Sequence, residues 1–266
     1  MTNEAISWEI VASIHESEKA RWSEAEKSWT EVRRLAQRLS DPHRELTAIE
    51  GVTRSLRTGG ADNKRILSAL EESYRLAIKL NKIEDIGRFL NSMAILEWEC
   101  QNYDKALAHY REALDIYQGL KANAKIGFIL NSIAVTLRSM HRFNEAMTTL
   151  DRALAIHRQM NERLLEGQAL VVMGHLHADL EHFDDAIHAY KLSLAIRRDI
   201  GDRLGEGWLS YHLAGIYIRQ KRVKDCMQLM AHVHGIASRH SDQALKHACQ
   251  ELESTVAAIE LSSFSQ

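Results

Sequence analysis

Proline and cysteine are scarce in this 266-residue sequence, which has one Pro and three Cys. With only 13 Gly as well, the chain has little room for long loops or for a strand-rich fold. The cysteines, Cys100, Cys226 and Cys249, are far apart, show no CxxC spacing and are odd in number, so we expect free thiols. These shortages predict an all-α fold.

The sequence also lacks an excess of charge and a long hydrophobic run. Lysine and arginine number 34 against 36 acidic residues, so nothing in the balance indicates nucleic acid or an anionic membrane as a partner. No stretch approaches the roughly 18 apolar residues of a membrane span, and the start, MTNEAISWEI, lacks a basic region followed by an apolar run. We therefore expect a cytoplasmic protein that does not bind membranes.

Motifs of catalysis are missing too. The sequence has no Gly-rich phosphate loop, HExxH, nucleophile elbow or dinucleotide fingerprint, so we expect neither an enzyme nor a bound cofactor. Among 14 histidines, the closest pairs are His175 with His177 and His232 with His234. Residues two apart on a helix point roughly 200° from each other, so neither pair can share one ion. We expect no metal site.

What the sequence does contain is a 40-residue unit that occurs three times without a gap, beginning at Gly87, Gly127 and Gly167. Within each half of the unit, apolar residues recur three, four and seven apart, which is typical of an amphipathic helix. Each unit is therefore predicted to be two helices joined by a short turn. The aligned positions include Leu90, Leu130 and Leu170; Ala94, Ala134 and Gly174; Tyr103, Phe143 and Phe183; Ala106, Ala146 and Ala186; and Tyr110, Leu150 and Tyr190.

Small residues mark where helices are expected to approach each other closely, as at Ala106 and its equivalents. The leading glycines, 87, 127, 167 and 207, lie where a helix should be starting, although Gly costs roughly 1 kcal/mol there relative to Ala. We expect them to allow approach to the preceding hairpin. Asn81, Asn161 and Gly201 are types that tolerate the left-handed conformation ending a helix, and Lys121 breaks that column.

The order of these residues resembles the tetratricopeptide repeat, in a form of about 40 residues rather than the usual 34. In the central unit the resemblance is carried by Leu130, Ile133, Ala134, Phe143, Ala146, Leu150 and Ala153. It implies a right-handed superhelical solenoid of about six helical hairpins. The chain departs from the family in the turn between helices, where the usual Gly is replaced by Gln101, His141, Glu181 and Lys221.

We expect this solenoid to be a single domain covering residues 1–266. Its units are expected at about residues 5–45, 46–86, 87–126, 127–166, 167–206 and 207–246. The first unit is less regular, with Trp8, Val11 and His15 in its first helix and Trp22, Ala25 and Trp29 in its second. A last amphipathic helix near residues 243–261 is expected to cap the array, which must cover its final apolar face.

The resemblance also implies where a partner binds, because the first helix of each hairpin lines the concave groove of a tetratricopeptide array. Asn91 and Asn131 repeat at one inward position, where an amide can donate to and accept from an extended peptide. Aromatic side chains there are either binding anchors or packing residues between hairpins. The candidate groove residues are Arg88, Asn91, Trp98, Asn131, Arg138, His175, Asp179, Trp208, Tyr211, His212 and Arg219.

Two functions follow from this reading. The first is a non-catalytic scaffold or adaptor that binds a protein or peptide segment in the groove. The second is a regulatory sensor, similar to the helical-repeat receptors for bacterial signalling peptides, in which ligand binding changes the superhelix. The sequence names no partner, and it leaves a homo-oligomer open.

Overall fold

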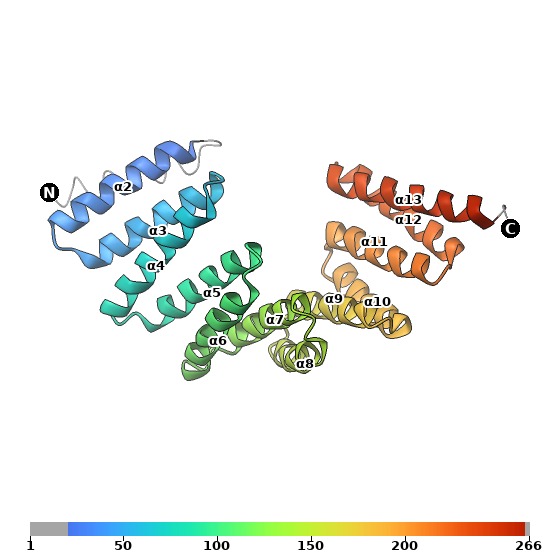
Figure 1. The fold of residues 1–266 in the computed structure, drawn as a ribbon, viewed down its shortest axis with the longest axis horizontal. Coiled ribbons are helices and arrows are strands. Elements are labelled where there is room, and N and C mark those ends of the chain that lie inside the picture. The colour runs from blue at the N-terminus through green and yellow to red at the C-terminus, as the bar shows by residue number, and fades with distance from the viewer. Residues whose placement is uncertain (1–20, 264–266) are drawn as a thin grey trace. The chain divides into compact units, whose positions relative to one another are not determined.

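A computed structural model describes residues 21–263, with side chains to residue 258, and shows twelve helices and no strand in that range (Figure 1). The expected first helix around Trp8 and Val11 lies outside the described residues. The chain divides into two compact units, Met1–Met140 and His141–Gln266. None of the described helices is both long and apolar enough to cross a membrane.

The helices α2 to α12 have 17 residues each and α13 has 21, and from α4 onward a helix begins every 20 residues. The first unit contains α2 (Trp22–Arg38), α3 (Pro42–Thr58), α4 (Asn63–Lys79), α5 (Ile83–Glu99), α6 (Tyr103–Gly119) and α7 (Asn123–Ser139). The second contains α8 (Phe143–Gln159), α9 (Arg163–Asp179), α10 (Phe183–Asp199), α11 (Arg203–Arg219), α12 (Val223–Arg239) and α13 (Gln243–Ser263).

The turns between helices share one geometry, in which a residue with positive φ follows the helix end. Lys121 has φ 53° and belongs to the column that it was expected to break, beside Asn81, Asn161 and Gly201. The replacements for the family's turn glycine behave in the same way, with φ 62° at Gln101 and 60° at Glu181. In most of these turns a backbone N–H donates to the carbonyl five residues back, as from His182 to His177 at 2.8 Å, so helix ends such as those before Gln101 and Glu181 close without Gly.

The recurring glycines lie one turn inside their helices, not at the start, because α5 begins at Ile83, four residues before Gly87. A Cβ at Gly87 would lie 3.0 Å from the Tyr117 ring and 3.2 Å from Ile116, both on α6. Gly87 therefore allows α5 to approach α6, the second helix of the same hairpin. The prediction that these glycines allow approach to the preceding hairpin is wrong. In α9 the carbonyl of Gly167 accepts a hydrogen bond from Ser193 of α10 at 2.8 Å.

The core follows the repeat columns. Ala106 in the first unit and Ala186 in the second are fully buried, as expected for close-contact points. At the C-terminal end, Leu245, Cys249 and Val256 of α13 join a buried cluster with residues of α11 and α12. The all-α fold of helical hairpins is thus confirmed, and α13 occupies the place expected for the cap.

Candidate functional site

The candidate groove residues lie on first helices of the hairpins, in both units. The first unit carries Arg88, Asn91 and Trp98 on α5 and Asn131 and Arg138 on α7. The second carries His175 and Asp179 on α9 and Trp208, Tyr211, His212 and Arg219 on α11.

Arg88 is exposed, but its charge is already paired. Its guanidinium donates to Glu50 of α3 and, at 2.9 Å, to Asp85, and it lies 4.6 Å from the centre of the Phe89 ring. Burial by itself would lower the pKa of Arg88. The hydrogen bonds to Glu50 and Asp85 have the opposite effect and together are stronger, so the pKa is raised above its ordinary value. A ligand carboxylate would have to displace Glu50 or Asp85, so Arg88 is poorly suited to bind one.

Arg88 is one of the residues that line a polar cavity of about 210 Å³. It lies between α3, α4 and α5 and is lined by Glu50, Thr53, Arg54, Arg57, Ile66, Leu70, Arg88, Phe89 and Ser92.

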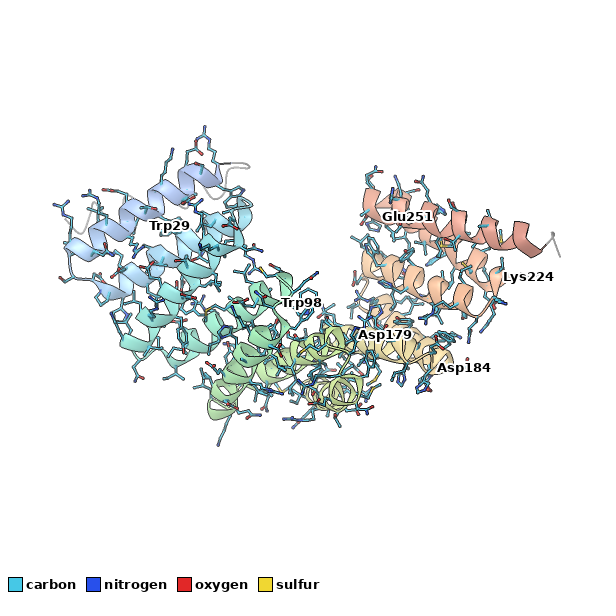
Figure 2. All side chains as sticks on the ribbon, viewed as in Figure 1. Trp29, Trp98, Asp179, Asp184, Lys224 and Glu251 are labelled. Carbon is cyan, nitrogen blue, oxygen red and sulfur yellow. The ribbon has the colours of Figure 1, made fainter. Side chains whose placement is uncertain are left out.

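Asn91 and Asn131 occupy equivalent positions on α5 and α7, and both are partly buried. The side-chain oxygen of each is buried and has no hydrogen-bond donor among the described residues. An unpaired buried carbonyl costs about 1–3 kcal/mol, so each amide gains by meeting a donor. The indole N–H of Trp98, near the C-terminal end of α5, is likewise buried without an acceptor in the described range (Figure 2).

In the second unit, aromatic and imidazole rings form a continuous row across α9 and α11. The His212 ring meets His175 edge-on at 4.9 Å and Tyr211 at 5.6 Å, and Tyr211 meets Trp208 at 6.0 Å. All four side chains are partly buried, and Trp208 and Tyr211 also pack on the core cluster. They are therefore packing residues with an accessible part. We call His175, Trp208, Tyr211 and His212 the aromatic row.

Tyr190 supports this row from α10, although the sequence indicates only that it occupies a repeat position. Its hydroxyl lies 2.7 Å from Nδ1 of His175, and the rings meet edge-on at 5.6 Å. Tyr190 is 1% exposed and fits because position 174 is Gly, where a Cβ would lie 2.3 Å from the Tyr190 ring. The sequence signal for this contact is Gly174, because the equivalent residues Ala94, Ala134 and Ala214 are all Ala.

The remaining two candidates in this unit lie at helix ends. Arg219 donates to the carbonyl of Ala178 at 3.0 Å, and its guanidinium lies 4.7 Å from the centre of the Phe183 ring. It therefore ties the end of α11 to the last turn of α9 and the start of α10, although its side chain remains 44% exposed. Asp179, the last residue of α9, is exposed (Figure 2).

A buried carboxylate anchors the first turn of α11, the helix that presents Trp208. Glu206 is 1% exposed and accepts from Arg198 at 2.7 Å, from Arg203 at 2.9 Å and from His232 at 3.0 Å. Burial raises the pKa of Glu206, but the hydrogen bonds from Arg198, Arg203 and His232 outweigh it and lower the pKa to about 2. Glu206 is thus ionised at neutral pH and holds three elements together.

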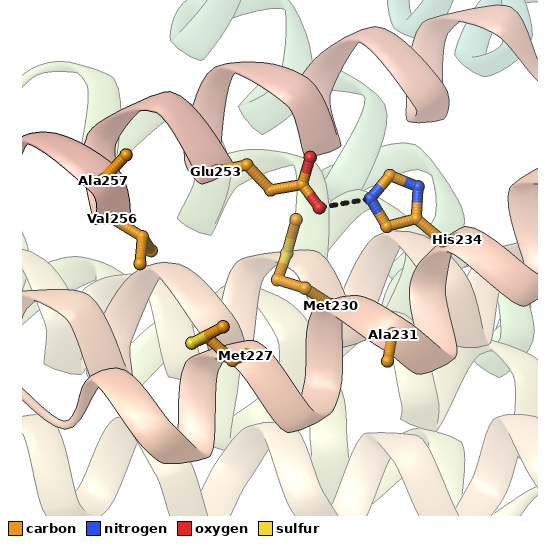
Figure 3. Close-up of a pocket in the computed structure, with 7 residues that line it drawn as sticks. All are labelled: Met227, Met230, Ala231, His234, Glu253, Val256 and Ala257. Atoms are coloured by element: carbon orange, nitrogen blue, oxygen red, sulfur yellow. Dashed lines mark hydrogen bonds and ion pairs between the residues drawn. The ribbon is translucent and has the colours of Figure 1, made fainter.

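A second cavity, of about 490 Å³, lies between α12 and α13, and none of the candidate groove residues lines it (Figure 3). Its floor is apolar, and on one side His234 contacts Glu253 through an N–O pair 2.6 Å apart. The lining residues are Met227, Met230, Ala231, His234, Glu253, Val256 and Ala257.

Comparison with known proteins identifies the repeat. The family model for the tetratricopeptide repeat matches residues 85–159 and 128–199. No curated protein sequence matches the chain.

Solved structures share the fold at low sequence identity. BtubC (BKLC) from P. vanneervenii superposes with a TM-score of 0.70 at 20% identity, over 83% of this chain and 91% of that one. Aspartyl phosphate phosphatase F from Bacillus subtilis gives 0.74 at 12% identity, over 91% of this chain and 62% of that one. A Rap protein complexed with Competence and Sporulation Factor gives 0.61 at 14% identity, over 93% and 79%. At these identities the likeness establishes the fold.

Proposed function

Because this chain is built of tetratricopeptide repeats, we propose that it is a non-catalytic scaffold that binds a protein or peptide segment along the first helices of its hairpins. Arrays of this kind hold other molecules in extended grooves. Charge balance, with no strong excess of either sign, favours a partner recognised by apolar and hydrogen-bonding groups.

The observation that carries the proposal is the aromatic row on α9 and α11. Trp and Tyr side chains dominate binding hot spots because they bury a large apolar area and retain a polar group. Trp208 and Tyr211 are held in place by the core below them, so ordering them on binding costs little side-chain entropy. The rings of His175 and His212 extend the row beside these apolar anchors.

Peptide selection tests the proposal without knowledge of the natural partner. A random peptide library displayed on phage is selected against the immobilised protein, and the enriched peptides are titrated against variants. Trp208→Ala and Tyr211→Ala should each weaken binding by roughly 10- to 30-fold, the loss expected for a hot spot. Leu192→Ala, at an exposed apolar residue of the second helix α10, is the control and should bind normally. Equal losses in all three variants would contradict the aromatic row as the binding surface.

The alternative proposal is a sensor whose helix arrangement changes when a signalling peptide binds. It is favoured by the shared fold with a Rap protein complexed with Competence and Sporulation Factor. Hydrogen exchange with and without a selected peptide separates the two. A scaffold gains protection only in the first helices α5, α7, α9 and α11 that the peptide contacts, whereas a sensor also changes protection in the second helices of the hairpins.

A further inference from the structure

Three metal-ligating side chains meet at the turn between α9 and α10. His177 lies in the last turns of α9, His182 is the residue just before α10, and Asp185 lies in the first turn of α10. One ligand atom from each, an imidazole nitrogen or a carboxylate oxygen, lies within 4.8 Å of the other two. From this geometry we propose that His177, His182 and Asp185 bind a divalent transition-metal ion of the zinc type.

The turn itself brings these residues together. Glu181 adopts φ 60°, and the backbone N–H of His182 donates to the carbonyl of His177 at 2.8 Å. The two imidazoles are consequently neighbours, with ring centres 6.2 Å apart. Asp185 follows His182 by three residues, which places both on one side of the first turn of α10. His175 and His177, two residues apart on one helix, point in different directions. His177 and His182, five residues apart across this turn, are neighbours.

His177 carries a buried polar atom at a repeat position whose residue type varies. The equivalent residues in α5, α7 and α11 are Glu97, Leu137 and Tyr217, all of them buried. In α9 the position holds an imidazole whose Nδ1 is buried and has no hydrogen-bond partner among the described residues. An unpaired buried nitrogen is unfavourable, and a bond to a metal ion would satisfy it. Coordination gives the imidazole a role that packing does not.

Two imidazoles and one carboxylate form a donor set suited to zinc, which takes such ligands in tetrahedral geometry with one position left for water. Zinc bonds of about 2.0–2.2 Å put neighbouring ligand atoms about 3.4 Å apart. The ligand atoms must therefore move closer than 4.8 Å, and His182 and Asp185 are exposed and free to change rotamer. Glu181 and Asp184 add negative charge beside the turn. They offset the positive charge of Arg219, whose guanidinium lies over the Phe183 ring.

Zinc titration of the chelator-treated full chain tests this site, and it does not depend on groove binding. Calorimetry should show about one tight equivalent of Zn²⁺ per chain, and Co²⁺ should give the visible absorption of a four-coordinate site. His182→Ala and Asp185→Asn should each weaken binding about 10-fold or more. Binding should also weaken as pH falls, because an imidazole must be neutral to coordinate a metal.

His188→Ala is the matched control, because His188 is an exposed histidine of the same helix α10 and lies outside the cluster. It should bind Zn²⁺ like the unmodified protein, and Zn²⁺ should raise the Tm of both but not of His182→Ala. His182 is exposed, so its loss leaves the fold intact, as circular dichroism will show. The proposal is overturned if the unmodified chain binds no stoichiometric Zn²⁺, or if His182→Ala and Asp185→Asn bind it as tightly as His188→Ala does.

Discussion

Gly174 shows how one missing methyl group shapes the aromatic row. An Ala Cβ there would lie 2.3 Å from the Tyr190 ring, so Gly174→Ala must displace Tyr190 and break its contact with His175. We expect a loss of about 1–3 kcal/mol in the free energy of unfolding, measured by urea titration, because overpacking strains a close-packed site.

Gly215→Ala on α11 is the control, and we expect it to change the free energy of unfolding in the opposite direction. Nothing lies within 4 Å of a Cβ at Gly215, so Ala adds helix propensity without a clash. It should leave stability unchanged or raise it by up to about 1 kcal/mol. If Gly174→Ala were as stable as Gly215→Ala, Tyr190 would not be fixed by the absence of that methyl group.

Glu206 should make stability depend on pH in the acid range. Its pKa is about 2 in the folded protein against a reference of 4.5, so its contribution is complete above pH 4.5 and is lost as pH falls towards 2. Glu206→Gln should destabilise the protein at pH 6, so its urea midpoint should lie below that of the unmodified chain. This difference in urea midpoint should become smaller between pH 5 and pH 3. Asp151→Asn, at an exposed acid of α8, should show no such gap. A gap that stays constant over this pH range would contradict the assignment to Glu206.

Single residues of the candidate site were predictable only where the repeat placed them. The shared position of Asn91 and Asn131 followed from the 40-residue period, and so did the placement of Trp208 and Tyr211 on a first helix. The pairing of Arg88 with Glu50 was not predictable, because the two residues lie 38 positions apart on different helices. The same holds for Tyr190 and His175, which meet only once the hairpin has formed.

At the scale of the element, the positive-φ residues between helices carry a testable cost. Lys121 sits at φ 53°, a region in which a side chain costs roughly 1 kcal/mol or more and Gly costs little. Lys121→Gly should therefore stabilise the protein by about 0.5–1 kcal/mol in chemical denaturation. Glu112→Gly, at an exposed position within α6, should instead destabilise it by roughly 1 kcal/mol. A loss of stability in Lys121→Gly would show that its side chain makes a compensating contact.

Helix type and order were readable from the sequence, and helix starts were not. Apolar spacing reports only residues that touch a neighbour, and the first residues of α5, Ile83 and Glu84, are exposed. The signal therefore begins at Gly87, which packs on α6, four residues into the helix. The turns were misread for a related reason. Residue type is a weak guide where hydrogen bonds to the preceding helix impose the left-handed conformation on Lys121 or Gln101.

At the scale of the whole molecule, the repeat made the fold class predictable because each hairpin packs mainly on its neighbours. The same property limits what the sequence says about function. Repeat positions that hold the fold recur and are visible, whereas a binding surface is the part of each unit that differs. Among the residues that the structure describes, the cluster of His177, His182 and Asp185 occurs in a single turn, so no repeat comparison could bring it out.

The end of an array needs a cover, and α13 should provide it through Leu245, Cys249 and Val256. Cys249 is fully buried, and burial chiefly raises the pKa of its thiol, to about 11, which indicates an apolar surrounding. Cys249→Asp places a carboxylate in that surrounding, so α13 should detach and expose the apolar residues of α11 and α12, at a cost of several kcal/mol.

Gln250→Asp introduces the same group one residue away, on the exposed face of α13, and should leave the cap in place. Size-exclusion chromatography with light scattering, together with dye binding to exposed apolar surface, distinguishes the two variants. Cys249→Asp should bind dye and self-associate, as should a chain ending at Asp242, because both uncover the same face of α11 and α12. If both remain monomeric and unfold at the same temperature as Gln250→Asp, the face beneath α13 needs no cover and α13 is not a cap.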